Sequence, residues 1–177
     1  GNIIDLGPQR DFDVEKELSK VLKFGFAIDH YDKFIRKLET ANNVLYLGDN
    51  AGEIVFDKIL VEELAAMGKN VTYVVKDGPI LNDATMEDAV YVGMDKVANV
   101  ITNGTNYLGT CLDILPAEFL DILLNAEVVI SKGQANFESL EQEEMAKGRV
   151  FFMLKAKCDY VAEKSGVKLG DSVFFTR

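Results

Sequence analysis

The sequence of 177 residues contains no tryptophan, one histidine, two cysteines and three prolines. With His30 alone, the chain can form neither an HExxH zinc motif nor a site with several histidine ligands. A metal would therefore be held by oxygen ligands, which favours Mg²⁺ or Mn²⁺ over zinc. Cys111 and Cys158 form no CxxC pair, so we expect a reduced, cytoplasmic protein with ordinary thiols.

Basic residues are few relative to acidic ones, with 19 Lys+Arg against 29 Asp+Glu and a net charge of −10. This charge repels phosphate backbones, so we expect no nucleic-acid partner. No apolar run approaches the roughly 20 residues that span a bilayer, so we expect no membrane partner. The sequence also contains no GxxxxGK[ST], which excludes a P-loop NTPase, and no GxGxxG, which argues against dinucleotide binding.

The apolar residues alternate between short runs and stretches with helical spacing. The runs predict strands at 44–47, 71–75, 97–101, 128–130 and 150–154, and helices at 54–68, 83–92, 116–125 and 138–147 between them. A short helix and the apolar run at 173–175 follow. This alternation predicts an α/β fold with three layers, α/β/α, and a mostly parallel, Rossmann-like sheet.

The domain organisation follows from the same pattern. Residues 1–42 are predicted to form a loop and a helical segment, with helical spacing at 14–22 and 31–38, that packs on the core. Residues 43–177 are predicted to form the α/β core. The chain begins at Gly1 rather than methionine, so we expect it to be part of a longer protein.

Polar side chains cluster directly after three of the predicted strands, in the segments GDNAGE (48–53), PILNDAT (79–85) and SKGQANF (131–137). In a parallel sheet these loops meet at one edge, where such folds bind ligands. Asp49, Asn50 and Asp83 then offer two carboxylates and an amide oxygen, a donor set suited to a hard divalent cation. Alternatively, Asp49 and Asp83 cap helices and Asn50 is a turn residue.

Several further residues could serve a phosphate-containing substrate. Lys132 could neutralise a phosphate, together with the backbone N–H groups of Gly133 and its neighbour. Asn136 could bind substrate or cap the next helix, and Asn103 could line the pocket or form a plain turn. Glu53 could act as a base, bind metal-bound water, or complement a helix N-terminus.

Two other function classes fit the same residues. The segment VLYLGDNAGE is similar to the strand and glycine loop with which methyltransferases bind S-adenosylmethionine, and Asp77 could then bind the ribose. Asp49 and Asn50 argue against it, because such loops usually carry small residues there. A non-catalytic module that binds small molecules is the third class.

Taken together, GDNAGEIVFD, PILNDAT and SKGQANFE resemble the damage-control phosphatase family, a metal-dependent family formerly listed as a domain of unknown function. The resemblance covers most of the chain and implies an α/β/α sheet with bound Mg²⁺, Mn²⁺, Co²⁺ or Ni²⁺. It places the metal ligands on Asp49, Asn50 and Asp83. It places the phosphate-binding lysine on Lys132, beside Gly133 and Asn136, and matches Glu53 to the acidic residue after the Asp-Asn pair.

The resemblance also implies the substrates, which are small phosphometabolites such as sugar phosphates or damaged cofactor phosphates. Family members usually carry a helical region before the position of Gly1, so we expect this chain to be the C-terminal catalytic portion, with the missing region completing the pocket. We therefore hypothesise a metal-dependent phosphatase in which Asp49, Glu53 and Lys132 are catalytic. The sequence leaves open whether Asp49 or water attacks the phosphorus, and a homo-oligomer is compatible with it.

Overall fold

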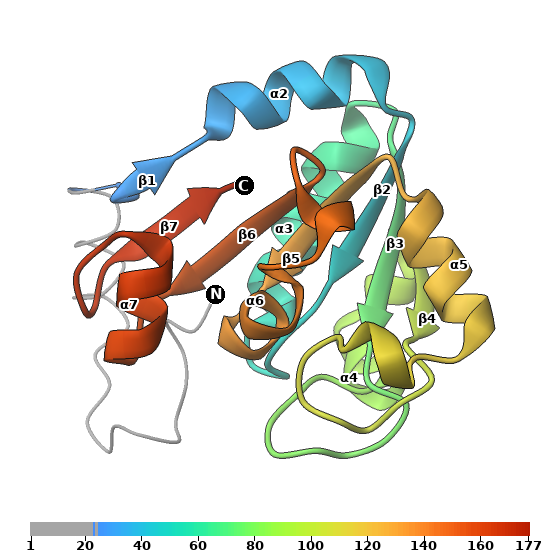
Figure 1. The fold of residues 1–177 in the computed structure, drawn as a ribbon. Coiled ribbons are helices and arrows are strands. Elements are labelled where there is room, and N and C mark those ends of the chain that lie inside the picture. The colour runs from blue at the N-terminus through green and yellow to red at the C-terminus, as the bar shows by residue number, and fades with distance from the viewer. Residues whose placement is uncertain (1–22, 24) are drawn as a thin grey trace.

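A seven-stranded sheet forms the centre of the computed structural model, which describes residue 23 and residues 25–177 (Figure 1). The predicted helix at 14–22 lies outside these residues. The strands are β1 (Ile28–Asp29), β2 (Asn43–Leu47), β3 (Asn70–Val75), β4 (Asn99–Thr102), β5 (Val128–Lys132), β6 (Val150–Lys155) and β7 (Ser172–Phe175). Their order is β1-β7-β6-β5-β2-β3-β4. Only the β6–β7 pair is antiparallel, so the sheet is mostly parallel, as predicted.

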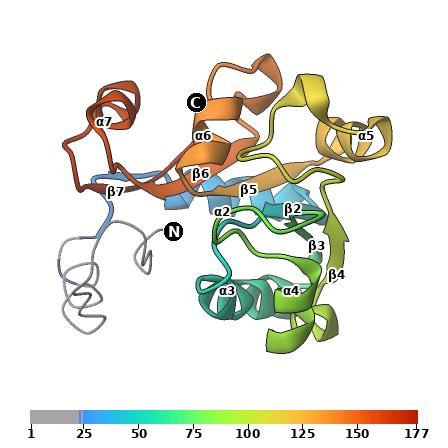
Figure 2. The same ribbon diagram turned by 90° about the horizontal axis from the view of Figure 1, so that it is seen from below.

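Helices cover both faces of this sheet (Figure 2). On one face lie α2 (Tyr31–Thr40), α3 (Ile54–Ala66) and α4 (Met86–Val92); on the other lie α5 (Ala117–Asn125), α6 (Gln134–Leu140) and α7 (Asp159–Ser165). Short 3₁₀ helices occupy Met94–Lys96, Leu112–Ile114 and Glu144–Ala146. This arrangement confirms the predicted three-layer α/β/α fold.

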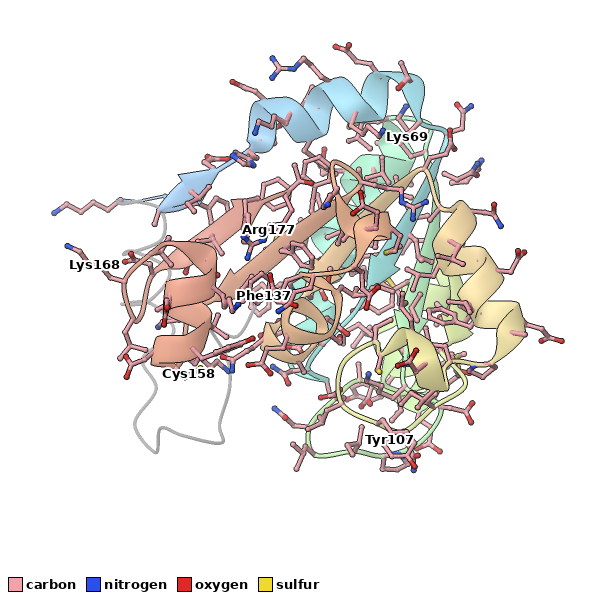
Figure 3. The ribbon with its side chains drawn as sticks, viewed as in Figure 1. Lys69, Tyr107, Phe137, Cys158, Lys168 and Arg177 are labelled. Carbon is pink, nitrogen blue, oxygen red and sulfur yellow. The ribbon has the colours of Figure 1, made fainter. Side chains whose placement is uncertain are left out.

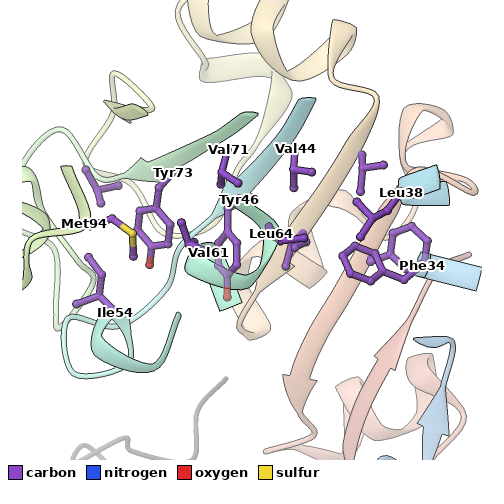
Figure 4. Close-up of a cluster of buried hydrophobic side chains, with 14 of the residues drawn as sticks. Phe34, Leu38, Val44, Tyr46, Ile54, Val61, Leu64, Val71, Tyr73 and Met94 are labelled. Carbon is purple, nitrogen blue, oxygen red and sulfur yellow. The ribbon is translucent and has the colours of Figure 1, made fainter. Parts of the chain in front are cut away.

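Each face of the sheet has its own hydrophobic core because the strands are apolar on both sides. On the α3 face, Tyr46 and Tyr73 pack with Phe34 and Leu38 of α2 and with Ile54, Val61 and Leu64 of α3 (Figure 4). The α3 residues recur at the spacing that directs one helix face inward. On the other face, Val129 and Phe152 pack with Phe119, Phe137 and Val161 from α5, α6 and α7.

Several predicted boundaries are wrong. The helix expected from residue 83 begins at Met86, because Thr85 caps it through a reciprocal capping box with Asp88. The helix expected at 138–147 begins at Gln134 and ends at Leu140. Strand β5 continues to Lys132, which is therefore a strand residue and not a loop residue.

The chain changes direction across the sheet at β2. Strand β3 follows β2 on one side, whereas β5 pairs with β2 on the other. Helix α3, which follows β2, lies on one face, and α6, which follows β5, lies on the opposite face. Such a switch point leaves a crevice at the carboxyl ends of the strands, where doubly wound folds bind ligands. The loops after β2 and β5 are the ones that carry Asp49 and Gly133.

None of the helices in the part of the chain that the structure describes is long and apolar enough to cross a membrane.

Candidate functional site

Backbone hydrogen bonds join the first two of the polar loops. The N–H of Ala51 donates to the carbonyl of Asn82, and the N–H of Ala84 donates to the carbonyl of Asp49, both at 2.8 Å. Asn50 and Asp83 face each other in an isolated β-bridge between these bonds. The backbone therefore fixes Asp49, Asn50 and Asp83 side by side, as the parallel sheet predicted.

The third loop closes on the first at Gly133. A Cβ atom at this position would lie 2.1 Å from Oδ2 of Asp49, and the residue has a φ of +82°. Only glycine satisfies both conditions, because other residues rarely adopt positive φ and any side chain would collide with the carboxylate. The Gly133 N–H donates to the carbonyl of Met153 at 3.1 Å, so it is used within the sheet. A contact between this N–H and a phosphate stays a prediction.

Neither candidate carboxylate acts as a helix cap. Helix α3 begins directly after Glu53, and α4 is capped by Thr85 and Asp88. Asn50 donates from Nδ2 to Oδ2 of Asp49 at 3.3 Å and to Oε1 of Glu53 at 3.4 Å. Its amide oxygen is therefore the atom that suits a cation. Among the residues that the structure describes, no three His, Cys, Asp or Glu side chains gather around one point, so a cation here would use this amide oxygen.

The electrostatics of the site show a surplus of negative charge at Asp49. Burial, with the nearby carboxylates of Glu53 and Asp83, raises the pKa of Asp49 to about 7, although Lys132 and Lys157 act in the opposite direction. Burial also raises the pKa of Asp83, against the influence of Lys76. At Asp49 the neighbouring carboxylates thus outweigh the lysines, which is the condition that a bound cation relieves.

Lys132 is almost fully buried at the end of β5 and forms two ion pairs. Its Nζ atom lies 3.2 Å from Oε2 of Glu53 and also binds Oδ1 of Asp57. Burial lowers the pKa of Lys132, but the carboxylates of Asp57 and Glu53 outweigh burial and hold this pKa well above its usual range. The ammonium is therefore fixed on the α3 side of the strand ends.

Asp57 links this lysine to the hydrophobic core on the α3 face of the sheet. Both of its oxygens accept hydrogen bonds from buried tyrosines, Oδ1 from the Tyr46 hydroxyl and Oδ2 from the Tyr73 hydroxyl, each at 2.8 Å. The hydroxyl ends of these stacked rings point in the same direction (Figure 4). A chain of contacts thus runs from the tyrosines through Asp57, Lys132 and Glu53 to the candidate metal ligands.

A second buried lysine lies on the other face of the sheet. Lys76, just beyond β3, donates from Nζ to the carbonyl of Gly109 at 2.6 Å, and its Nζ lies 3.8 Å from Oδ2 of Asp83. Burial lowers the pKa of Lys76, while Asp83 and Asp49 act to raise it. Lys76 also lines a small recess with the predicted residues Asn103 and Asn136.

The two asparagines make different contacts. Asn136 donates from Nδ2 to the carbonyls of Gly48 at 3.2 Å and Lys132 at 2.9 Å, and its Oδ1 accepts a bond from Thr110. It therefore ties the first and third loops together, and a direct contact with substrate stays a prediction. Asn103 accepts from the N–H of Thr105 at 3.0 Å, which is the turn anticipated as an alternative, and also lines the recess.

The sequence profile of the damage-control phosphatase ARMT1-like domain matches residues 1–173. The chain belongs to this family. It is 40% identical over 175 residues to a damage-control phosphatase, PH1575, of Pyrococcus horikoshii, with 96% of this chain and 59% of that protein covered. It is 39% identical over 178 residues to a damage-control phosphatase of Archaeoglobus fulgidus, with 98% of this chain and 60% of the relative covered.

The comparison with solved structures identifies the same family as the comparison of sequences. A crystal structure of the family protein PH1575 superimposes with a TM-score of 0.89 at 38% identity, covering 99% of this chain and 62% of the other. An uncharacterized protein of Methanocaldococcus jannaschii, MJ0202, is 41% identical over 181 residues, which cover all of this chain and 60% of the relative. The chain thus spans about 60% of the length of these relatives.

Sequence reasoning missed two residues of this damage-control phosphatase domain. Asp57 reads as an ordinary polar position of a helix, although it falls four residues after Glu53 and within the apolar stretch IVFDKIL. That spacing puts both carboxylates on one helix face, a signal that could have identified it. From the sequence, Lys76 is interpreted as a turn residue. Its place in the site becomes visible only through the contact with Asp83 in the structure.

Proposed function

We propose that the protein is a phosphatase that hydrolyses small phosphate monoesters, such as sugar phosphates or damaged cofactor phosphates, with one bound divalent cation. The observation that carries this proposal is the meeting of Asp49, Asn50 and Asp83 at the switch point of the sheet with uncompensated negative charge. The names of the two damage-control phosphatase relatives support the same activity.

The residues present fit such a cation. Two carboxylates and an amide oxygen are hard donors, and a set this small leaves room for waters and substrate oxygens, as Mg²⁺ prefers. The absence of a side chain at Gly133 leaves to the Asp49 carboxylate the place that a Cβ atom would take. When bound, the cation would polarise a phosphoryl oxygen and offset the charge that develops in the transition state. The candidate cations are Mg²⁺, Mn²⁺, Co²⁺ and Ni²⁺.

The chain's own residues would position the reaction. Lys132 supplies positive charge from the α3 side of the strand ends, held in place by Asp57. Glu53, which lies 3.2 Å from that ammonium, is the carboxylate placed to accept a proton from an attacking water. Asp49 could instead attack the phosphorus itself, and the configuration at an isotopically chiral phosphate separates these routes. Direct attack by water inverts the configuration, whereas attack by Asp49 followed by attack of water on the aspartyl phosphate retains it.

Phosphate release from a panel of sugar and cofactor phosphates tests the proposal. The protein is stripped of metal with a chelator and then given Mg²⁺, Mn²⁺, Co²⁺ or Ni²⁺. We expect activity that depends on the restored metal and is lost in Asp49→Ala and Asp83→Ala. Asp77→Ala is the matched control, because Asp77 also follows β3 but is exposed and binds the Thr102 hydroxyl.

The full-length Pyrococcus relative serves as a second subject in this assay. We propose that the part of the relatives outside the present chain completes the substrate pocket, so the relative should turn over bulky esters better. Metal-independent hydrolysis, or full activity of Asp49→Ala, would contradict the proposed function. The methyltransferase alternative gains no support from the two relatives, which are named as phosphatases.

A further inference from the structure

The recess beside Lys76 is a built site that the phosphatase mechanism above does not use. It is a small recess of about 10 Å³, the room that one water molecule or one ligand oxygen needs, and it is partly open to solvent at the carboxyl ends of β2 and β3. Its walls are the strand residues Leu47, Gly48, Val74 and Val75, together with the side chains of Lys76, Asn103, Thr110 and Asn136. It therefore lies next to Asp49 but on the α6 face of the sheet, opposite Lys132.

The walls of this recess are held rigidly. Gly109, at φ +73°, packs so closely on α6 that a Cβ atom there would lie 2.5 Å from the carbonyl of Ala135. The next residue, Thr110, donates its N–H to the Oγ atom of Ser139 at 2.8 Å and its hydroxyl to Oδ1 of Asn136 at 2.7 Å. A ligand would thus meet a preformed site and lose little free energy to ordering it.

Two hydrogen-bond donors face an incoming ligand. The ammonium of Lys76 has three N–H groups, of which one donates to the carbonyl of Gly109. Asn103 is 3% exposed, and the hydrogen bonds that its side chain makes with the described residues are accepted by Oδ1, so the Nδ2 group remains as a donor. Donors of this kind select an oxyanion.

The two lysines of the site differ in how their charges are balanced. Lys132 binds two carboxylates directly, so a smaller part of its charge is left to act on a ligand. The carboxylates that act on Lys76 are those of Asp83 and Asp49, and the Oδ2 atom of Asp83, at 3.8 Å from Nζ, lies beyond direct hydrogen-bond distance. If Asp83 coordinates a cation, as proposed above, its carboxylate compensates less of the positive charge on Lys76. The ammonium can then attract an anion.

We propose that Lys76 and Asn103 form a second oxyanion-binding position of the site, which holds the phosphoryl group on the α6 side of Asp49. The inference rests on the proposed function and deepens it. One non-bridging oxygen of the phosphate would then enter the recess and accept hydrogen bonds from Lys76 and Asn103. Inorganic phosphate, the product of the proposed reaction, should occupy the same position.

Binding of inorganic phosphate is the experiment that tests this inference. Phosphate is titrated into the Mg²⁺-loaded protein and followed by calorimetry and by ³¹P line broadening. Three variants are compared with the unchanged chain, namely Lys76→Met, Asn103→Asp and the control Lys69→Met. Lys69 also donates to backbone carbonyls, of Leu38 at 2.6 Å and Ala41 at 2.9 Å, but lies at the far end of the sheet from the loop with Tyr107 (Figure 3).

We expect the dissociation constant for phosphate to rise about tenfold or more in Lys76→Met and Asn103→Asp, the loss expected for a charge-assisted hydrogen bond. The control should bind phosphate as the unchanged chain does. Asn103→Asp keeps the acceptor for Thr105, so it preserves the turn while adding a repulsive charge. The increase in melting temperature on adding Mg²⁺ should persist in both variants, which would show that the cation still binds.

Two outcomes would overturn the inference, and they can be told apart. If both variants bind phosphate as tightly as the unchanged chain, while ester hydrolysis remains metal-dependent, Lys76 has no such role and the proposed function stands. If the unchanged chain neither binds phosphate nor releases it from any ester, the proposed function fails together with the inference.

Discussion

Lys132 at the end of β5 and Glu53 at the start of α3 form a buried ion pair, with 3.2 Å between Nζ and Oε2. Since Asp57 binds the same ammonium, two carboxylates share one lysine beneath the candidate metal ligands. Pairs of this kind contribute little when intact but are expensive to break, because the remaining group is left buried without its partner.

Replacing Asp57 with alanine should therefore destabilise the protein by about 3–5 kcal/mol. The change removes one partner of Lys132 and leaves the hydroxyls of Tyr46 and Tyr73 without acceptors. Urea unfolding measures the loss. Asp95→Ala, at an exposed position, should alter the free energy of unfolding by less than about 0.5 kcal/mol. A similar small change for Asp57 would contradict the network described here.

Gly133→Ala should displace the Asp49 carboxylate and abolish metal-dependent stabilisation. The new methyl group would fall on Oδ2 of Asp49, and the backbone at φ +82° disfavours it as well. Gly166→Ala separates the two effects, because Gly166 has a similar φ of +75° but no atom within 4 Å of its Cβ position. Melting temperatures with and without Mg²⁺ provide the test, and retention of the Mg²⁺ effect in Gly133→Ala would count against this geometry.

Asp49 should make the metal-free protein less stable as pH rises. Its pKa is raised from 3.8 to about 7 on folding, so between these values the folded state binds more protons than the unfolded state. The contribution of this group to stability therefore falls through pH 4 to 7 and is level above about 7. The loss is on the order of 4 kcal/mol at most.

Asp49→Asn removes this titration, so the difference in stability between Asp49→Asn and the unchanged chain should grow in favour of the variant over the same interval. Unfolding free energies at pH 4.5, 6 and 8 in the presence of a chelator measure the difference. A constant difference across these values would show that the carboxyl group titrates normally. Saturating Mg²⁺ should remove the pH effect, because the cation favours the ionised carboxylate.

Leu81→Asn should stabilise the loop that carries Asp83. Leu81 has a φ of +46° and is 83% exposed, so its side chain gains little by burial while its backbone is strained. Asparagine tolerates this conformation, and we expect a gain of about 0.5–1 kcal/mol in unfolding free energy. Leu169→Asn, at another exposed leucine without positive φ, should show no gain. Equal effects of the two changes would exclude backbone strain as the cause.

The order of strands and helices could be predicted because it depends on local patterns. Runs such as Val71–Val75 are apolar on both faces, and a buried parallel sheet is the structure that satisfies them. The meeting of the three polar loops followed from that sheet without knowledge of any contact. The predicted N-terminal segment and the domain boundary at residue 42 stay predictions.

The remaining features depend on contacts between distant residues. Strand β5 was predicted to stop at Ile130, because Ser131 and Lys132 are polar; Lys132 stays in the buried strand only because Glu53 and Asp57 compensate its charge. The start of α6 was missed for a similar reason. The helix begins directly after Gly133, and Gly133 packs against the carboxylate of Asp49, a distant residue in the sequence. The contacting residues Glu53, Asp57 and Asp49 all lie far from these positions in the sequence.

The stacked pair of Tyr46 and Tyr73 gives the protein a built-in optical probe. Because the chain has no tryptophan and six tyrosines, its near-ultraviolet absorption and its fluorescence come mainly from these rings. Two of the six donate to Asp57 and thereby sense the carboxylates and the ammonium next to the candidate site. The emission of tyrosine depends on the hydrogen bond of its hydroxyl. Occupancy of the site should therefore be readable from the light that the unlabelled protein emits.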